Sequence, residues 1–373
     1  MVHSVIGKVK DTKINNNLKI LSIVGARPQF IKAALISREL RKNFKEILVH
    51  TGQHFDHEMS EIFFKELNIP KPEYNLGIHG HSNSEQIGLM MIELEKVLNK
   101  EKPNLVLVYG DTDSTLAGAL TASKLKIPIA HVEAGMRSFD RSMPEEINRI
   151  VTDHISSILF CPNINAINLL KKEGIKKNVH DLGDVMYDLM NECLKNEKMK
   201  IQKLSKLKLS PKGYLLATVH RAGNTDNEIK LKTIFEALSE SNETIVIPIH
   251  PRTKKAIATY GITLGNNIKI IEPVNYYEML FLEKNAKKIL TDSGGIQKEA
   301  YWLGIPCITL RENTEWTETV EDNWNILVGS DKLQILNSIK NFTPVHNRSF
   351  LPKKNSHLRI SKIIMDFFDN KNY

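Results

Sequence analysis

Short apolar runs alternate with amphipathic segments along most of the chain. The runs 19–24, 46–50 and 105–109 are rich in Val, Ile and Leu, which is typical of strands that are buried on both faces. Segments 29–40 and 84–98 have apolar residues at helical spacing. Strands that alternate with helices of these lengths predict a doubly wound parallel sheet.

The alternating pattern occurs twice. The first set continues through strands expected at 127–132, 155–161 and 179–182, and the second set has strands expected at 214–219, 244–249, 268–271, 289–290 and 307–310. The lysine-rich segment from Glu192 to Lys212 separates the two sets and is the best candidate for a domain boundary. We therefore expect an α/β protein with two Rossmann-like domains facing across a cleft, at residues 18–190 and 191–350, followed by a C-terminal helix within 351–373.

Acidic residues follow the strands of the first set. Asp111 comes after strand 105–109, Glu133 after strand 127–132, and Pro144 can start a helix that has Glu145 in its first turn. Ligands of open α/β sheets bind at the carboxyl ends of the strands, so these acids indicate an active site. Each could instead cap a helix or pair with a nearby arginine, but we favour acid/base roles for at least two of them.

Basic residues and glycines follow several other strands. The turn after the first strand contains Arg27, which could bind an anion or lie on the surface. His220 and His250 follow two strands of the second set, as structural caps or as groups that bind a pyrophosphate or transfer a proton.

A DSGG turn opens a helix in the second set. Its Ser293, Gly294 and Gly295 let bare backbone approach a phosphate at a helix N-terminus, and Glu299 lies one turn later, where it could accept hydrogen bonds from ribose hydroxyls. The alternative is an ordinary helix cap with a surface glutamate. Convergence with the basic strand ends favours phosphate binding.

Composition narrows the class of protein. The 373 residues are 41% hydrophobic and 25% charged, which is typical of a globular protein. No apolar run reaches the length of a membrane span and residues 1–17 lack a signal-peptide core, so we expect a cytoplasmic protein without a membrane partner. The three cysteines lack metal-ligand spacing, and the histidines near residue 54 lack a further ligand, so we expect no metal.

The net charge of +8 raises the question of nucleic acid as a partner. Many of the lysines gather in 195–212 without interleaved aromatic residues, a pattern more typical of a solvated face. We expect no nucleic-acid partner. A positive field would also favour the capture of a small anionic substrate.

The chain resembles the non-hydrolysing UDP-N-acetylglucosamine 2-epimerases from residue 18 to about residue 329. The resemblance rests on the joint order of GARPQFIKAA, HTGQHFDHEMS, YGDTDSTLAGAL, AHVEAGMRSFDRSMPEEINR, LGDVM, VHRAGN, HPR, EPVNYYEML and TDSGGIQKEA. It implies the two-domain GT-B glycosyltransferase fold, with a final helix that packs back on the N-terminal domain. It also implies a homodimer with a UDP-sugar substrate and no cofactor.

The reaction that the resemblance implies would use the acids for proton transfer. The C2 hydrogen of the sugar is not next to a carbonyl, so the resemblance implies elimination of UDP to a 2-acetamidoglucal and re-addition with the opposite configuration. The positions that match the family's catalytic groups are Asp111, Glu133, Glu145 and His220. Those that match UDP-binding groups are Arg27, His250, Met279, Ser293, Gly294, Gly295 and Glu299. A second UDP-sugar, or the substrate itself, would contact Gln53, His54 and Gln86.

Three positions depart from the common family pattern. Gly223 stands where many members have Glu, Trp316 lies in TEWTE where TERPE is common, and Lys298 replaces a frequent Glu. We expect conversion of UDP-N-acetylglucosamine to UDP-N-acetylmannosamine for surface polysaccharide precursors. The alternatives are the branch that epimerises UDP-2,3-diacetamido-2,3-dideoxyglucuronate, which these variants resemble, and a GT-B glycosyltransferase, which the acid-rich first domain disfavours.

Overall fold

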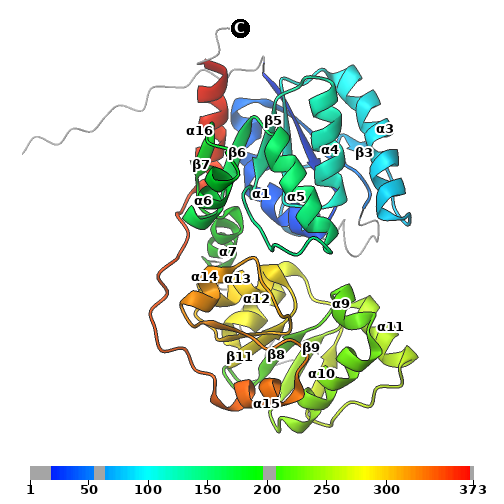
Figure 1. The fold of residues 1–373 in the computed structure, drawn as a ribbon, viewed down its shortest axis with the longest axis vertical. Helices are drawn as coiled ribbons and strands as arrows, with labels where there is room; N and C mark the ends of the chain where they lie inside the picture. Colours follow the sequence, from blue (N-terminus) through cyan, green and yellow to red (C-terminus); the bar gives the residue numbers. More distant parts are fainter. Residues whose placement is uncertain (1–17, 54–63, 196–206, 370–373) are drawn as a thin grey trace, which may run out of the picture.

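The computed structural model describes residues 18–53, 64–195 and 207–369, which form two parallel β-sheets one above the other (Figure 1). The first sheet has the strand order β3-β2-β1-β4-β5-β6-β7. Its strands are β1 (Lys19–Val24), β2 (Lys45–His50), β3 (Tyr74–Asn75), β4 (Leu105–Tyr109), β5 (Ile129–Val132), β6 (Ile158–Cys161) and β7 (Val179–Asp181).

The second sheet has the order β10-β9-β8-β11-β12-β13, again with parallel neighbours. Its strands are β8 (Leu215–Thr218), β9 (Ile245–Pro248), β10 (Ile268–Ile271), β11 (Lys288–Thr291), β12 (Cys307–Thr309) and β13 (Asn325–Leu327). In both sheets the order reverses direction beside the first strand, β1 or β8. This arrangement confirms the prediction of two Rossmann-like units and creates a switch point in each, where open α/β sheets bind ligands.

Helices cover both faces of each sheet (Figure 1). Those of the first half are α1 (Arg27–Asn43), α3 (Asn83–Glu101), α4 (Asp113–Lys124), α5 (Pro144–Ile155), α6 (Ile164–Lys172) and α7 (Val185–Lys195). Those of the second half are α9 (Ala222–Thr225), α10 (Glu228–Glu240), α11 (Pro251–Thr259), α12 (Tyr276–Asn285), α13 (Gly294–Leu303), α14 (Thr317–Glu321) and α15 (Lys332–Asn341), and α16 (Ser356–Asp369) ends the described chain.

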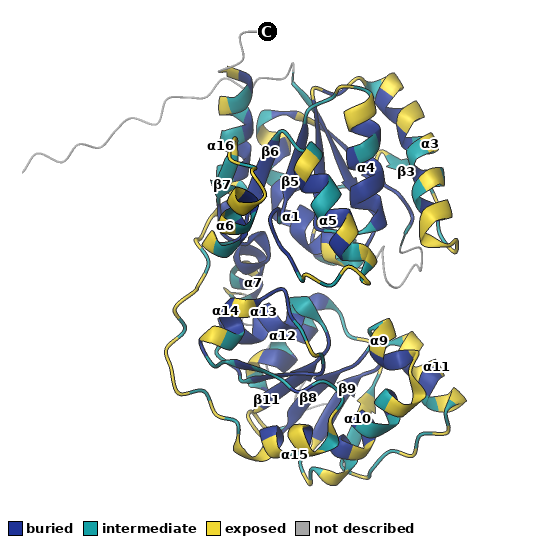
Figure 2. Cartoon of the chain, in the orientation of Figure 1, coloured by how far each residue is buried: buried dark blue, intermediate teal, exposed yellow. Residues whose placement is uncertain are grey.

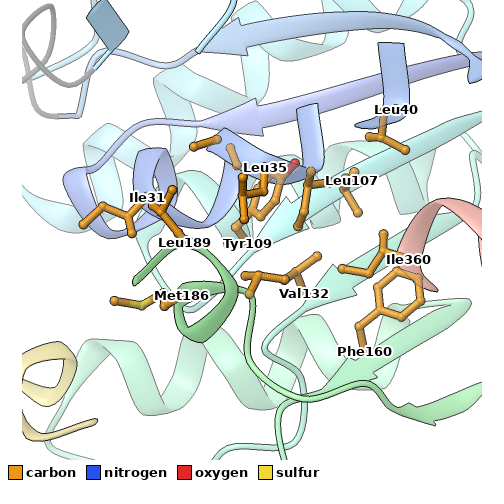
Figure 3. Close-up of a cluster of buried hydrophobic side chains, with 14 of the residues drawn as sticks. Ile31, Leu35, Leu40, Leu107, Tyr109, Val132, Phe160, Met186, Leu189 and Ile360 are labelled. Carbon is orange, nitrogen blue, oxygen red and sulfur yellow. The ribbon is translucent and has the colours of Figure 1, made fainter. Parts of the chain in front are cut away.

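The strands are buried because helices pack on both of their faces (Figure 2). All five residues of β4 and all four of β8 are buried, which explains their continuous apolar sequences. One cluster joins side chains of α1, α7 and α16 with those of β4, β5 and β6 (Figure 3). Separate clusters fill the second sheet's two faces.

The two halves meet through α7, α12 and α13. Tyr276 and Leu280 of α12 and Trp302 of α13 belong to the same buried cluster as the first sheet. The Trp302 ring meets Tyr187 of α7 edge-on, with ring centroids 5.3 Å apart. The halves therefore share part of their core. The proposed boundary segment, 192–212, runs from the end of α7 through residues 196–206, which lie outside the described part, so the limits of the domains stay a proposal.

The last helix returns to the first half. After α15 the chain runs along the outside of the molecule to α16, which packs against α1 and α7 (Figure 1). Ser356 donates to the carbonyl of Leu182, and Asn43 of α1 donates to Ser361 at 3.1 Å. Ile360, Ile364 and Phe368 complete the first cluster.

The sequence-based element limits differ from the observed ones at a few places. The apolar pattern predicts a strand from Ile155 to Cys161, but Ile155 ends α5 and the strand begins at Ile158. The short strands β3 and β13 were not predicted, since runs of two or three residues carry no periodic signal.

Candidate active site

A cavity of about 330 Å³ lies between the carboxyl ends of the two sheets. Its walls contain residues that follow β1, β4 and β5 of the first sheet and β8, β9 and β11 of the second. Ten of the residues singled out from sequence line it: Arg27, Asp111, Glu133, His220, His250, Met279, Ser293, Gly294, Gly295 and Glu299. The two switch points thus form one site.

Gln29 organises the turn that presents Arg27. The Gln29 side chain accepts from the backbone N–H of Gly25 at 2.7 Å and of Ala26 at 3.0 Å, and it donates to the Tyr109 carbonyl at 2.9 Å. It therefore ties the β1–α1 turn to the end of β4. Burial lowers the pKa of Arg27, and the nearby carboxyls of Glu299 and Glu283 oppose this shift.

Glu133 projects into the cavity from a residue with left-handed backbone, at φ 71°. Its carboxylate accepts from Lys32 at 2.8 Å and from Lys298 at 3.1 Å. Burial alone would raise the pKa of Glu133, but Lys298 and Lys32 outweigh burial and lower it to about 2. Glu133 is therefore ionised throughout the neutral range.

Asp111 is held by Arg149 of α5, which donates to it and also to Glu146 at 2.9 Å. The same guanidinium lies 3.9 Å from Glu315 of the second half. Glu315 in turn accepts from Arg311 at 3.0 Å. This chain of ion pairs links Asp111 to the opposite wall of the cavity.

Glu145 is placed differently from the other acids. It lies in the first turn of α5, as its sequence predicts, but it is not among the residues that line the cavity. Its neighbour Glu146 is buried and accepts from the backbone N–H of Ser138 and Phe139. Glu146 thus anchors the preceding loop, and a catalytic role for Glu145 stays a prediction.

His220 and His250 lie together on the second half's wall. Their rings stack with centroids 5.5 Å apart. The carboxylate of Asp292 accepts from the backbone N–H of His220 and of Arg221, which fixes this strand end. Burial lowers the pKa of His220, with Asp292 opposing it and Arg27 and other arginines adding to it, so the neutral imidazole is favoured at neutral pH.

Three helix N-termini point into the cavity. Arg27 and Pro28 begin α1, His250 caps α11, and Ser293 caps α13 by accepting from the N–H of Ile296. A Cβ on Gly294 would lie 3.3 Å from the indole nitrogen of Trp316, so the bare backbone fits closely there. Converging N–H groups and positive dipole ends suit a diphosphate.

Glu299 lies behind the α13 turn. Tyr276 donates to its Oε1 at 2.7 Å, which leaves Oε2 for a ligand. Burial raises the pKa of Glu299 to about 7, although the Tyr276 hydrogen bond, Lys298 and Arg27 counteract it. Met279 of α12 is buried and supplies an apolar surface to the same end of the cavity.

Two of the three residues considered for a second ligand, Gln53 and Gln86, contact the N-terminus of α4. Gln53 accepts from the hydroxyl of Ser114 at 2.7 Å, and Gln86 donates to Asp113 at 3.3 Å. Neither glutamine lines the cavity itself. His54 lies outside the described residues.

Several lining residues were not singled out as site residues from the sequence. They come from both halves and comprise Lys32, Arg149, Arg221, Lys298, Glu315 and Trp316. Lys298 and Trp316 were noted only as departures from the family pattern, and in the structure the Lys298 ammonium lies 4.0 Å from the centre of the Trp316 ring. Arg221 and Glu315 follow the strands β8 and β12, which was the available signal, whereas Lys32 and Arg149 lie within the helices α1 and α5, where no strand end marks them.

No cluster of His, Cys, Asp and Glu that could hold a metal ion occurs within the described residues. Over the same part of the chain, no helix combines the length and the apolar character needed to cross a membrane.

Two Rossmann-like sheets that share one ligand cavity define the GT-B class of α/β proteins. A structure of the Methanocaldococcus jannaschii UDP-GlcNAc 2-epimerase in complex with UDP-GlcNAc and UDP superposes with a TM-score of 0.88 at 47% identity, covering 94% of this chain and 100% of that one. This confirms the predicted fold.

The chain belongs to the UDP-N-acetylglucosamine 2-epimerase family, whose profile matches residues 38–364. A UDP-N-acetylglucosamine 2-epimerase homolog of Methanococcus maripaludis is 56% identical over 93% of this chain and 99% of its own. The UDP-2,3-diacetamido-2,3-dideoxy-D-glucuronate 2-epimerase of Pseudomonas aeruginosa is 50% identical over 87% and 92%. The resemblance drawn from the motifs is thereby confirmed.

Proposed function

We propose that the protein is a non-hydrolysing 2-epimerase that converts UDP-N-acetylglucosamine to UDP-N-acetylmannosamine. One observation carries the proposal: a single cavity has an anion cradle on the second sheet and carboxylates on the first. A UDP-sugar has both a diphosphate and a reacting carbon to match these two walls. Family membership agrees with this reading.

The UDP half of the substrate fits the second wall. The N-termini of α11 and α13, with Arg27 from α1, would bind the diphosphate oxygens. Glu299 would accept hydrogen bonds from the ribose hydroxyls, and Met279 would contact uracil. His220 and its neighbour His250 lie beside the diphosphate position, where the neutral His220 could donate to or accept from the departing oxygen.

The sugar half would lie against the acids. In the forward step a carboxylate takes the C2 proton, the C–H electron pair forms the C1–C2 double bond, and the C1–O bond breaks with its pair leaving on UDP. In the return step a proton is delivered to the other face of C2 and UDP oxygen attacks C1. The two steps together need no external oxidant, reductant or cofactor. Asp111, Glu133 and Glu145 are our candidates for the two proton transfers.

Turnover in deuterated water tests the reaction. The proton returned to C2 comes from a group that exchanges with solvent, so UDP-N-acetylglucosamine should gain one deuterium at C2 as UDP-N-acetylmannosamine appears. Mass spectrometry and proton NMR give both readouts. Substrate recovered without label after long incubation would exclude this sugar.

The second candidate substrate is UDP-2,3-diacetamido-2,3-dideoxyglucuronate. The observation that favours it is the 50% identical relative from Pseudomonas aeruginosa. A parallel incubation with this sugar decides between the two. The substrate with the higher kcat/KM is the one whose transition state the site stabilises more strongly, and we would assign it as the substrate of this enzyme.

Substitution of the acids separates chemistry from binding. Asp111→Asn and Glu133→Gln should each lower kcat by about 10²-fold or more, because each loses a proton acceptor. Both should retain UDP affinity, which isothermal titration would measure. If a variant epimerises at the rate of the parent enzyme, the substituted residue has no acid/base role. Glu145→Gln tests the third acid in the same way.

We further propose that the enzyme is a cytoplasmic homodimer that supplies precursors of a surface polysaccharide. Support comes from the family alone. Analytical ultracentrifugation of the full chain decides the oligomeric state, and a sedimenting monomer at micromolar concentration would argue against the dimer.

A further inference from the structure

Two lysines from different halves of the molecule hold the carboxylate of Glu133. Lys32 of α1 donates to Oε1, and Lys298 of α13 donates to Oε2. Each oxygen thus has its own cation. Lys298 belongs to the second half, so the second contact exists only where the two halves meet.

Lys298 is itself held on every side. It is 2% exposed and donates to Asp184, in the turn before α7, at 2.6 Å. The Trp316 ring lies 4.0 Å from the Lys298 ammonium and the Trp302 ring 5.4 Å. Glu299 and Glu318 are further titratable groups that experience its charge. A buried ammonium with two carboxylates and two indoles around it has little freedom to move.

We propose that Lys298 is a positioning residue that keeps Glu133 ionised and oriented towards the sugar, and that this contact depends on the meeting of the two halves. The inference rests on the proposed epimerase function. An ionised carboxylate can accept the C2 proton but cannot donate one, so Lys298 would assign Glu133 to the accepting step.

The physical argument compares Glu133 with and without its second cation. Burial favours the protonated carboxyl, and the two ammonium groups reverse that preference. With Lys298 removed, Oε2 would lose its donor while Lys32 still held Oε1. The protonated form of Glu133 would then be favoured more strongly than before, and the orientation of its carboxyl group would be less restricted.

Titration of Glu133 in the full-length protein tests this directly. Carbon-13 NMR of labelled glutamate carboxyls, with the resonance assigned by its loss in Glu133→Gln, should show the midpoint of Glu133 at least one pH unit higher in Lys298→Met. In the pH profile of kcat/KM, the acid limb should move to higher pH by the same amount. The value of kcat should fall about ten- to a hundredfold. Lys298→Arg retains a cation and should return the limb towards that of the parent.

Lys288 supplies a matched control. It is a buried lysine of the same half, and its ammonium donates to the carbonyls of Ser338 and Ile339 at 3.1 and 2.6 Å, away from the cavity. Lys288→Met should lower stability without moving the Glu133 titration or the acid limb.

Each outcome decides the inference. An unchanged Glu133 titration in folded Lys298→Met would overturn it, whatever the activity. If the parent enzyme epimerises neither sugar, the proposed function fails while the titration still answers the structural question. If Lys298→Met does not fold, the double variant Lys298→Met/Asp184→Asn removes both members of one ion pair and is read by the same two measurements.

Discussion

Glu299 combines a raised pKa with a direct place in the proposed ribose site. Since burial raises its pKa to about 7, the carboxyl is partly protonated at neutral pH and becomes a full acceptor only above it. Ligand affinity should therefore increase as the pH rises from about 6 to about 8, by about tenfold for a hydrogen bond to a charged acceptor.

Uridine is the better probe for this prediction, because the terminal phosphate of UDP titrates near pH 6 and would mask the effect. Calorimetry across the pH range gives the slope for the parent protein and for Glu299→Gln. The variant should bind uridine with a flat pH dependence, and a parallel slope in both proteins would remove Glu299 from the ribose site.

Lys298 and Trp316 are two departures from the family pattern that touch each other. The family pattern that the motifs resemble has Glu and Arg at these positions, which is also a complementary pair. Lys298→Glu alone would place a third carboxylate beside Glu133 and Asp184, and it should reduce both stability and turnover. Adding Trp316→Arg should restore part of each.

A double-mutant cycle measures this coupling. We expect the two substitutions to be non-additive by more than about 1 kcal/mol in the free energy of unfolding, because the side chains are in contact. Additive effects would mean that the two side chains contribute independently to the free energy of unfolding despite their contact.

At the scale of single elements, the N-terminal turn of α1 depends on one amide. Gln29 is fully buried and satisfies the N–H groups of Gly25 and Ala26. Gln29→Ala should lower the free energy of unfolding by about 3 kcal/mol, since buried donors lose their acceptor. It should also raise the KM for the UDP-sugar, because Arg27 lies in this turn.

Chemical denaturation and initial rates measure these two effects. Gln334→Ala in α15 is the control, since Gln334 is exposed and is not among the residues that line the cavity. An equal loss of stability in both variants would contradict the role assigned to the Gln29 amide.

The elements were predictable where apolar residues form continuous runs. β1 and β4 were located to the residue because polar residues and turns bound their apolar runs. Ile155 was misassigned because only Ser156 and Ser157 separate it from the next strand, and an apolar residue can end a helix as readily as it can begin a strand. The limits of a strand can therefore be predicted only where polar or turn-forming residues separate it from the neighbouring elements.

The site was predictable to the extent that it follows strand ends. Asp111, Glu133 and Ser293 each come directly after a buried run, and all line the cavity. The Glu133–Lys298 contact was not predictable, because its partners lie 165 positions apart in different halves of the molecule. Periodicity places a residue on its own element, but the pairing across the cavity is decided by how the two sheets are assembled.

At the scale of the whole molecule, α16 contributes to a core that begins with β1. Ile364 is fully buried there, whereas Leu358 on the same helix is 43% exposed. Ile364→Ala should destabilise the first half by about 2–5 kcal/mol through the cavity it leaves. Leu358→Ala should change stability by no more than about 0.5 kcal/mol.

Hydrogen exchange resolves where the stability is lost. In Ile364→Ala the amides of α1 and α7 should exchange faster, while those of α10 and α15 keep the rates of the parent. Uniform acceleration in both halves would show that α16 stabilises the molecule as a single cooperative unit instead.

The position of α16 also has a consequence for biosynthesis. The ribosome makes the first sheet before the second, but the helix that closes the outer side of its core follows the whole second half in the sequence. The first half is therefore translated before the second half and completed after it. Until then the surface that Ile360, Ile364 and Phe368 will cover is open, and a nascent chain that stalls late exposes it to chaperones and proteases.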